Sequence, residues 1–420
     1  MTVDLLAQPP FTPTDPAFAA AWQRGLEVLQ PTASELEHGL ELHRSLTVCE
    51  HYGFLPGVWS ERAMASYLSA GDGLSYVDFQ RRQSYLRTAD LAQSPETREA
   101  FLAALRQAGV HGLVLPVNDY GESVTDAIVR IAAYRHLCLE FSDSLFQTTK
   151  ADDLEGARRN GSTGLIFSLT GLPLFGAGEM TDPGALLDWV EIWYGMGVRF
   201  MHLGYNRRNV FADGCGERND GGLSELGHDL IARMNEVGMI VDVPHSSRRT
   251  LLEAVAASSQ PVIASHIGCQ AVFDGARCKS DEEIKAIAST GGYVGIYSIP
   301  SLLGDDGDLN LMLRHVAHAL RLVGPEHVVI STDLGHNPEP PQPLPQGLPG
   351  GWRRVAAAGR HKFKPEGRTS LEHFGGSLAW TNKPLITVGL VKLGLSDEAI
   401  AQMHFGNLKR VLDAVRKGID

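Results

Sequence analysis

The chain has 420 residues, of which 43% are hydrophobic and 20% are charged, and its formal net charge is −12. This composition is typical of a globular protein with a large core, and the length suits one large α/β barrel or two ordinary domains. The acidic balance argues against a surface for nucleic acid or anionic membranes, because either surface requires a basic patch.

Cysteine usage and the N-terminus favour a cytoplasmic protein. The five cysteines are scattered and form no C-x-x-C pair, which is typical of reduced thiols: Cys49, Cys138, Cys215, Cys269 and Cys278. The N-terminal residues lack a charged segment followed by an apolar one, and no window approaches the roughly 20 apolar residues of a membrane span. We therefore expect a cytoplasmic protein with no nucleic-acid or membrane partner.

In chain order, residues 1–42 are Pro-rich and then helical, and we expect them to pack on the outside of a main domain formed by residues 43–420. Apolar strand patterns then alternate with helical ones. The predicted strands end near His51, Val117, Gln147, Leu169, Leu203, Val243, Ser265, Tyr297 and Thr332. The predicted helices lie at 94–109, 124–141, 152–161, 185–197, 248–258, 281–292, 310–324, 384–394 and 396–415.

Eight or nine strands that alternate with helices favour a closed parallel (β/α)8 TIM barrel with C-terminal helices. A doubly wound open sheet is the alternative, but no G-x-G-x-x-G follows the first strand. The Pro- and Gly-rich segment 337–351 and the region 60–90 are expected to shape the entrance to a site.

Polar residues follow three successive strand patterns between Gly195 and His266. Tyr205 and Asn206 follow VRFMHL, His245 follows MIVDV, and His266 ends PVIASH. Active sites of parallel barrels lie at the C-terminal ends of the strands, so we expect these side chains to share one site.

Two further strand ends carry residues that suit a metal site. His51 follows the first strand pattern and Asp333 the last, and these strands are neighbours in a closed barrel. Neutral imidazole is the commonest protein ligand of Zn²⁺, and a carboxylate serves as a ligand or as a base. The alternative for each residue alone is a polar loop position without function.

Arg277 lies in the loop after the His266 strand, where it could bind a substrate carboxylate through two parallel hydrogen bonds or could be a solvated loop residue. Tyr205 and Asn206 could bind substrate or serve the structure of the loop. Cys49 is a possible nucleophile, although the sequence identifies no general base for it.

From about residue 45 to the C-terminus, the chain resembles the renal (membrane) dipeptidase family, barrel metallopeptidases related in fold to the amidohydrolases. The resemblance rests on GVRFMHLGYNRRN, GLSELGHDLIARMNEVGMIVDVPHSS, TLLEAVAASSQPVIASH, the Arg277 loop, DEEIKAIASTGGYVGI, EHVVISTD and FGNLKRVLDAV. It implies that His245 and His266 bind zinc, that Arg277 binds a substrate carboxylate, that Asp333 is the active-site aspartate, and that the protein is a homodimer.

Three positions depart from the family pattern. The His-x-Asp pair becomes His51-Tyr52-Gly53, the metal-bridging glutamate falls on Thr170, and the histidine of the T-H-N tripeptide falls on Tyr205. A bridging carboxylate offsets the repulsion between two zinc ions, which a neutral threonine does not do. We therefore expect one zinc ion, or none, in place of two.

The first hypothesis is a zinc-dependent hydrolase of a dipeptide-like or small amide substrate that carries a carboxylate. His51, His245 and His266 would bind the metal, Asp333 would be the base, Tyr205 would stabilise the oxyanion, and Arg277 and Asn206 would bind substrate. The alternatives are a barrel enzyme of altered, metal-free chemistry and a non-catalytic binding protein.

Overall fold

The computed structural model describes residues 11, 13, 16–58, 60, 88–119, 122–173, 182, 184–305, 307–336 and 376–417. The proposed entrance segments, 60–90 and 337–351, therefore lie almost entirely outside the described residues.

Eight parallel strands form a barrel, in the order β1-β2-β4-β5-β6-β7-β9-β10. They are β1 (Cys49–Glu50), β2 (Gly112–Pro116), β4 (Thr163–Leu169), β5 (Val198–His202), β6 (Ile240–Asp242), β7 (Val262–Cys269), β9 (Val294–Ile296) and β10 (Val328–Ile330). Just beyond the last and first strands, Asp333 N donates to Tyr52 O (2.9 Å) and Phe54 N donates to Leu334 O (3.0 Å). These bonds join the two ends of the sheet, and the predicted TIM barrel is confirmed.

Two short strands lie off this path. β3 (Leu145–Gln147) pairs with the first half of β4, and β8 (Cys278–Lys279) pairs with the end of β7. The strand expected at Gln147 therefore exists but is not one of the eight barrel strands, and β8 was not expected.

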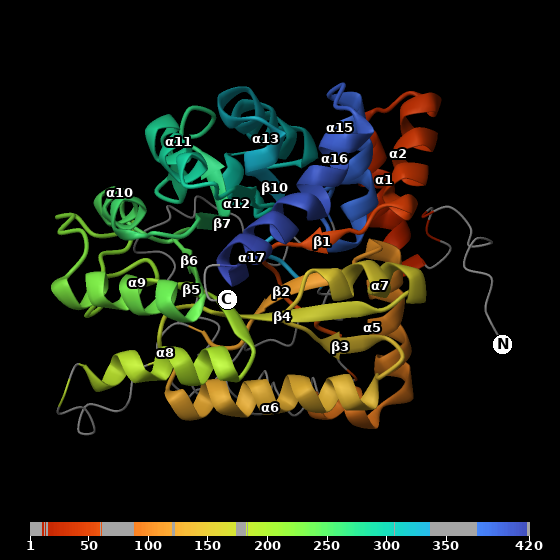
Figure 1. Cartoon of the computed structure of the whole chain (residues 1–420). Coiled ribbons are helices and arrows are strands. Elements are labelled where there is room, and N and C mark those ends of the chain that lie inside the picture. Colours follow the sequence, from red (N-terminus) through yellow and green to blue (C-terminus); the bar gives the residue numbers. More distant parts are fainter. Residues whose placement is uncertain are drawn as a thin grey trace, which may run out of the picture.

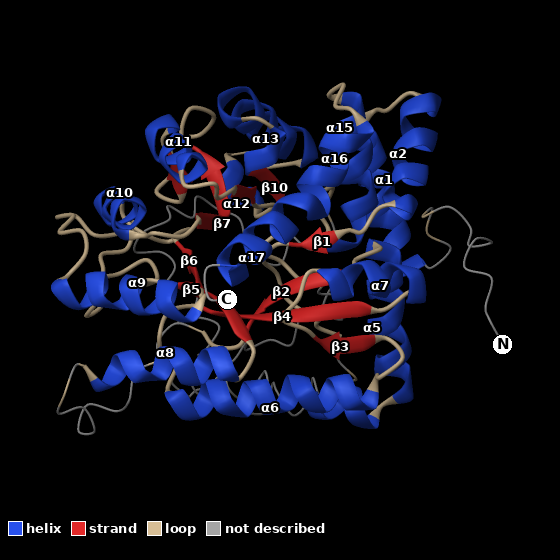
Figure 2. Ribbon diagram, viewed as in Figure 1, coloured by secondary structure: helices blue, strands red, loops and turns tan. Residues whose placement is uncertain are grey.

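Helices surround the strands (Figures 1 and 2). Those between the barrel strands are α5 (Pro95–Ala108), α6 (Val124–Glu140), α7 (Asp152–Asn160), α8 (Ala185–Gly195), α9 (Glu225–Val237), α10 (Arg248–Ala257), α11 (Asp281–Ser289), α12 (Pro300–Leu303) and α13 (Leu309–Val323). Side-chain caps fix several of their starts: Ser123 and Ser280 form capping boxes with Asp126 and Glu283.

The first two helices pack against a helix from the C-terminal part of the chain on one side of the barrel. α1 (Pro16–Leu29) and α2 (Ala33–Ser45) lie beside α15 (Lys383–Lys392), so the red and blue helices are adjacent in Figure 1. The short helices η2 (Pro325–His327), η4 (Trp380–Asn382), α16 (Asp397–Ala401) and η5 (Gln402–Gly406) and the C-terminal helix α17 (Asn407–Lys417) complete the described chain. The division of the chain into an N-terminal extension, residues 1–42, and a barrel domain, residues 43–420, stays a prediction.

Alternation along the strands divides the core into two layers. Side chains directed into the barrel form one cluster with α17: Val114, Ile166, Phe200, Ile240, Ile263, Val329, Leu408, Val411 and Leu412. Their strand neighbours, such as Leu113, Leu165 and Val241, pack outward against the helices in a second cluster. Because successive strand residues face opposite sides, this alternation also decides which polar residues near the strand ends point inward.

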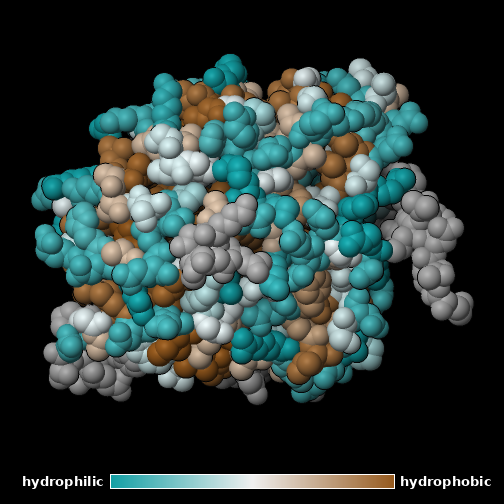
Figure 3. All heavy atoms as spheres, viewed as in Figure 1, coloured by the Kyte–Doolittle hydropathy of each residue, from teal (hydrophilic) through white to brown (hydrophobic). Residues whose placement is uncertain are grey.

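Polar side chains cover most of the face of the molecule seen in Figure 3, with smaller apolar patches between them. No helix in the described part of the chain is long and apolar enough to span a membrane.

Candidate active site

Two buried histidines face each other at adjacent strand ends. His245 follows β6 and His266 lies in β7, and their Nε2 atoms are 3.0 Å apart. Burial, reinforced by the nearby Arg277, lowers the pKa of both imidazoles well below the usual value. Both rings are therefore neutral near pH 7. Two Nε2 lone pairs cannot lie this close without a proton or a cation between them, and neutral imidazole nitrogens are typical ligands that would hold Zn²⁺.

The loop after β5 fixes the orientation of the His245 ring. Asn206 Oδ1 lies 2.8 Å from His245 Nδ1, so Nδ1 donates to the amide oxygen and Nε2 keeps its lone pair. The Tyr205 ring stacks on His245 with 4.0 Å between ring centroids. Both residues that the sequence suggested at this strand end therefore contact a predicted metal ligand.

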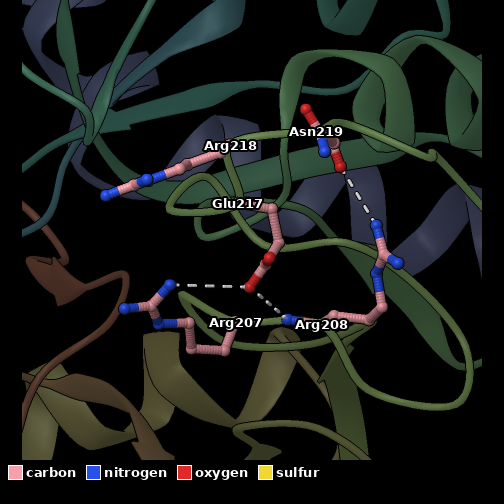
Figure 4. Close-up of a pocket in the computed structure, with 5 residues that line it drawn as sticks. All are labelled: Arg207, Arg208, Glu217, Arg218 and Asn219. Atoms are coloured by element: carbon pink, nitrogen blue, oxygen red, sulfur yellow. Dashed lines mark hydrogen bonds and ion pairs between the residues drawn. The ribbon is translucent and has the colours of Figure 1, made fainter.

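Ion pairs hold this loop in place. Arg208 forms a two-pronged ion pair with Asp213, with N–O distances of 2.5 and 2.7 Å. Figure 4 shows Glu217 between Arg207 and Arg208, while Arg218 extends away from them. A surface cavity of about 280 Å³ is lined by Arg207, Arg208, Glu217, Arg218 and Asn219. Gly216 N donates to Asn206 O (3.0 Å), so the ion-paired loop positions the amide that holds His245.

Asp333 lies beside the histidine pair. Its Oδ2 is 3.9 Å from His266 Nε2, and its backbone adopts the left-handed conformation with φ of 54°. Burial raises the pKa of its carboxyl group to about 7; the Arg277 charge opposes the increase and Glu50 adds to it. A carboxyl with this pKa exchanges protons near neutral pH, as a general base requires.

Arg277 is buried and belongs to the same cluster. Its guanidinium donates to Pro244 O, lies 3.3 Å from His245 Nε2 and contacts His266 O at 3.4 Å. The alternative of a solvated loop arginine is therefore wrong. The short strand β8 that follows Arg277 pairs with β7 and holds it against the two histidines.

His51 has other partners. His51 Nε2 donates to His404 O (3.1 Å), the His51 ring packs edge-on against Tyr293, and its Nδ1 has no hydrogen-bond partner among the described residues. Burial lowers its pKa to about 3. β1 ends at Glu50, and beyond that point it is Tyr52 that turns toward the histidine pair. The structure brings His245, His266, Asp333 and Arg277 together, and the hydrogen bond and ring contact of His51 among the described residues go to His404 and Tyr293 instead.

Tyr52 is a site residue that the sequence did not reveal. Its ring stacks on His266 with 4.3 Å between centroids, and its hydroxyl is 3.0 Å from Thr170 Oγ1. Thr170 is held in turn by Asn118, whose Oδ1 accepts from Thr170 N at 2.8 Å. Burial raises the pKa of the Tyr52 phenol well above its usual value, so it is uncharged. Two neutral hydroxyls thus occupy the side of the site where the resemblance implied a bridging carboxylate.

His202 and Asp242 form a second unexpected pair. His202 Nε2 and Asp242 Oδ2 are 3.1 Å apart and almost completely buried, although their alignment does not suit a hydrogen bond. The His202 ring lies 5.6 and 5.5 Å from the His245 and His266 rings. The inward alternation Phe200, His202 in VRFMHL was the available signal.

The residues present fit one metal ion better than two. The opposed Nε2 atoms of His245 and His266 and the neighbouring Asp333 supply typical zinc donors. A second ion would meet the Tyr52–Thr170 hydroxyl pair and no carboxylate. In the described part of the chain, no three or more His, Cys, Asp or Glu side chains are already grouped as a metal site.

Cys49 is buried and its thiol pKa is raised, which argues against the nucleophile alternative.

Curated relatives of the chain are dipeptidases. Dipeptidase tcpJ of Claviceps purpurea is 26% identical over 285 residues, 64% of this chain and 65% of that protein. An uncharacterized dipeptidase of Schizosaccharomyces pombe is 28% identical over 230 residues, 53% of each chain. Dipeptidase verJ of Clonostachys rogersoniana is 26% identical over 304 residues, 72% of this chain and 68% of that protein. The chain thus spans less than two thirds of the length of the first two.

Solved structures share the fold. An amidohydrolase from Pseudomonas aeruginosa superposes with a TM-score of 0.67 at 23% identity, over 90% of this chain and 98% of that chain. A metallo peptidase from Rhodobacter sphaeroides, liganded with a phosphinate mimic of the dipeptide L-Ala-D-Ala, gives 0.61 at 16% identity, over 88% and 99%.

The family assignment rests on a family model. The model described as membrane dipeptidase (peptidase family M19) matches residues 72–346, more than half of the chain. This segment contains Thr170, Tyr205, His245, His266 and Asp333. The chain belongs to the membrane dipeptidase family of metallopeptidases.

Proposed function

We propose that the protein is a hydrolase of dipeptide-like or small amide substrates that uses a single zinc ion held by His245 and His266. The observation that carries the proposal is the pair of Nε2 atoms 3.0 Å apart, with the Asp333 carboxylate beside them. When bound, zinc would polarise the substrate carbonyl and make water more acidic.

The chain's own groups would divide the remaining work. Asp333 would accept a proton from the attacking water, because its carboxylate lies beside the histidine pair that would hold the metal. Asn206 would keep His245 in the tautomer that presents Nε2. The Tyr205 hydroxyl would stabilise the negative charge that develops on the carbonyl oxygen.

Arg277 would bind the substrate carboxylate. Its guanidinium now lies 3.3 Å from His245 Nε2, the lone pair that a metal needs. Metal binding would therefore require the guanidinium to withdraw from His245, which frees its donors for a carboxylate. Direct binding of substrate by Asn206 and a third metal contact from His51 stay predictions, as do the cytoplasmic location and the homodimer.

Metal analysis tests this proposal. Protein purified without chelators should hold about one zinc per chain, His245→Ala should lose it, and the exposed His136→Ala on α6 should retain it. Hydrolysis of a dipeptide panel that includes L-Ala-D-Ala should follow the metal content. Two zinc ions per chain would contradict the role given to the Tyr52–Thr170 pair.

A metal-free function is the second candidate, because Arg277 occupies the lone pair of His245 and no three-residue metal group is formed among the described residues. Absence of zinc together with turnover of the panel would favour altered, metal-free chemistry. Absence of both would favour a non-catalytic binding protein.

A further inference from the structure

A buried ion pair lies between β1, β10 and α15, outside the site described above. Glu50 Oε2 and Lys383 Nζ are 2.8 Å apart, and neither side chain is exposed. Removing two charges from water costs several kcal/mol per ion, so a buried pair is weak support for stability by itself. The other contacts of the Glu50 carboxylate indicate what the pair does.

The Glu50 carboxylate binds the residue that precedes Asp333. Thr332 N donates to Oε1 at 2.6 Å, and Thr332 Oγ1 donates to Oε2 at 2.8 Å. Thr332 Oγ1 also accepts from Leu334 N at 3.2 Å. With Lys383, three donors converge on one carboxylate, which a neutral amide with a single acceptor oxygen cannot satisfy. Hydrogen bonds to an ionised acceptor are also about twice as strong as neutral ones.

Asp333 adopts a conformation that needs such support. It and Gln30 are the two non-glycine residues with positive φ in the described part of the chain. For residues other than glycine this conformation costs on the order of 1 kcal/mol, and it persists where neighbouring contacts enforce it. Asp333 N donates to Tyr52 O at 2.9 Å, and Glu50 holds the preceding residue. The strained backbone directs the carboxylate toward His266.

We infer that Glu50 and Lys383 are positioning residues that act through Thr332 to hold the Asp333 carboxylate at the histidine pair. The inference rests on the proposed function, in which Asp333 is the base. It adds to that function an ion pair between β1 and α15 that lies outside the candidate active site. Neither residue touches the substrate. The negative charge of Glu50 provides two acceptor oxygens for the backbone and side chain of Thr332, and the positive charge of Lys383 neutralises the carboxylate in the core.

The first experiment uses the double variant Glu50→Gln/Lys383→Met, which leaves no unpaired charge in the core. We expect it to fold, to keep the zinc content of the wild type, and in a crystal structure to show Asp333 out of its left-handed conformation and farther from His266 than 3.9 Å. With the dipeptide that the wild type cleaves best, kcat should fall about tenfold while KM changes less than about twofold.

One control variant, Thr387→Val, and one matched pair, Thr332→Val and Thr332→Ser, separate positioning of Asp333 from simple attachment of α15. Thr387→Val breaks the buried contacts of Thr387 on the same helix with His43 (2.7 Å) and His404 (2.9 Å), so it should lower stability and leave kcat and Asp333 unchanged. Thr332→Val should lower kcat because it removes the hydroxyl that bonds Glu50, and Thr332→Ser, which keeps a hydroxyl, should restore it.

An unchanged Asp333 conformation in the double variant, with unchanged kcat, would overturn the inference and leave the ion pair as an attachment of α15 only. If the double variant does not fold, Thr332→Val and Thr332→Ser are compared by kcat and by the conformation of Asp333 in their crystal structures, and these two measurements decide. If the wild type cleaves nothing in the panel, the proposed function fails, and the conformation of Asp333 in these crystal structures still decides the inference.

Discussion

In metal-free protein, Asp333→Asn should stabilise the fold, and the gain should grow with pH. The folded carboxyl has a pKa of about 7, against an ordinary value of 3.8. Between these values the unfolded chain releases the proton while the folded protein keeps it, so the wild type loses stability as pH rises from about 4 to 7. Asparagine has a similar shape, tolerates positive φ and does not ionise.

The pKa difference sets the size of the effect. About three pH units at about 1.4 kcal/mol each give about 4 kcal/mol above pH 7. The Asp333 side chain is 16% exposed, so water screens part of this cost. We expect the variant to gain about 2–4 kcal/mol over the wild type between pH 4.5 and pH 8.

Urea unfolding followed by tryptophan fluorescence, with a chelator present, measures this difference at both pH values. Asp229→Asn on the exposed face of α9 serves as the control for the loss of one negative charge. A gain in Asp333→Asn that is equal at the two pH values, or larger at the lower one, would refute the assignment of a buried, protonated Asp333.

Three other variants test the buried ion pair and two contacts of the site. Glu50→Gln alone should cost about 3–5 kcal/mol in urea unfolding, because it leaves the Lys383 charge buried without a negatively charged partner; a loss below about 1 kcal/mol would contradict this. Tyr52→Phe should lower the free energy of unfolding by about 1–2 kcal/mol, because it leaves Thr170 Oγ1 without its hydrogen bond. Adding Thr170→Val should recover most of that loss, and a double variant as unstable as Tyr52→Phe would contradict this role of the hydroxyl pair. Asn206→Leu should weaken zinc binding about 10–100-fold in competition with a chelator, since His245 loses the group that orients its ring, and unchanged affinity would exclude this role.

The sequence by itself determined the barrel and its most informative strand ends. Apolar strand patterns alternate with capped helical patterns, and the C-terminal ends of parallel strands meet at one end of a barrel. His245, His266 and Asp333 follow or end such strands, so their proximity could be predicted from local pattern alone. The same reasoning included Asn206 and Tyr205, which contact His245.

Only the tertiary structure decided which side chains beyond β1 face the site. β1 has two residues, and past Glu50 the strand alternation no longer governs direction. His51 consequently packs toward His404 while Tyr52 stacks on His266. A family pattern aligned on the histidine alone cannot detect this change in direction.

Tertiary contacts also decided the charged residues. Arg277 was equally compatible with a solvated loop until pairing of β8 with β7 buried it against His245. Glu50 and Lys383 are 333 residues apart, and no local pattern couples them. Local sequence determines where a strand ends, because periodicity and capping act over a few residues. Which charges meet in the core depends on distant segments brought together when the barrel closes.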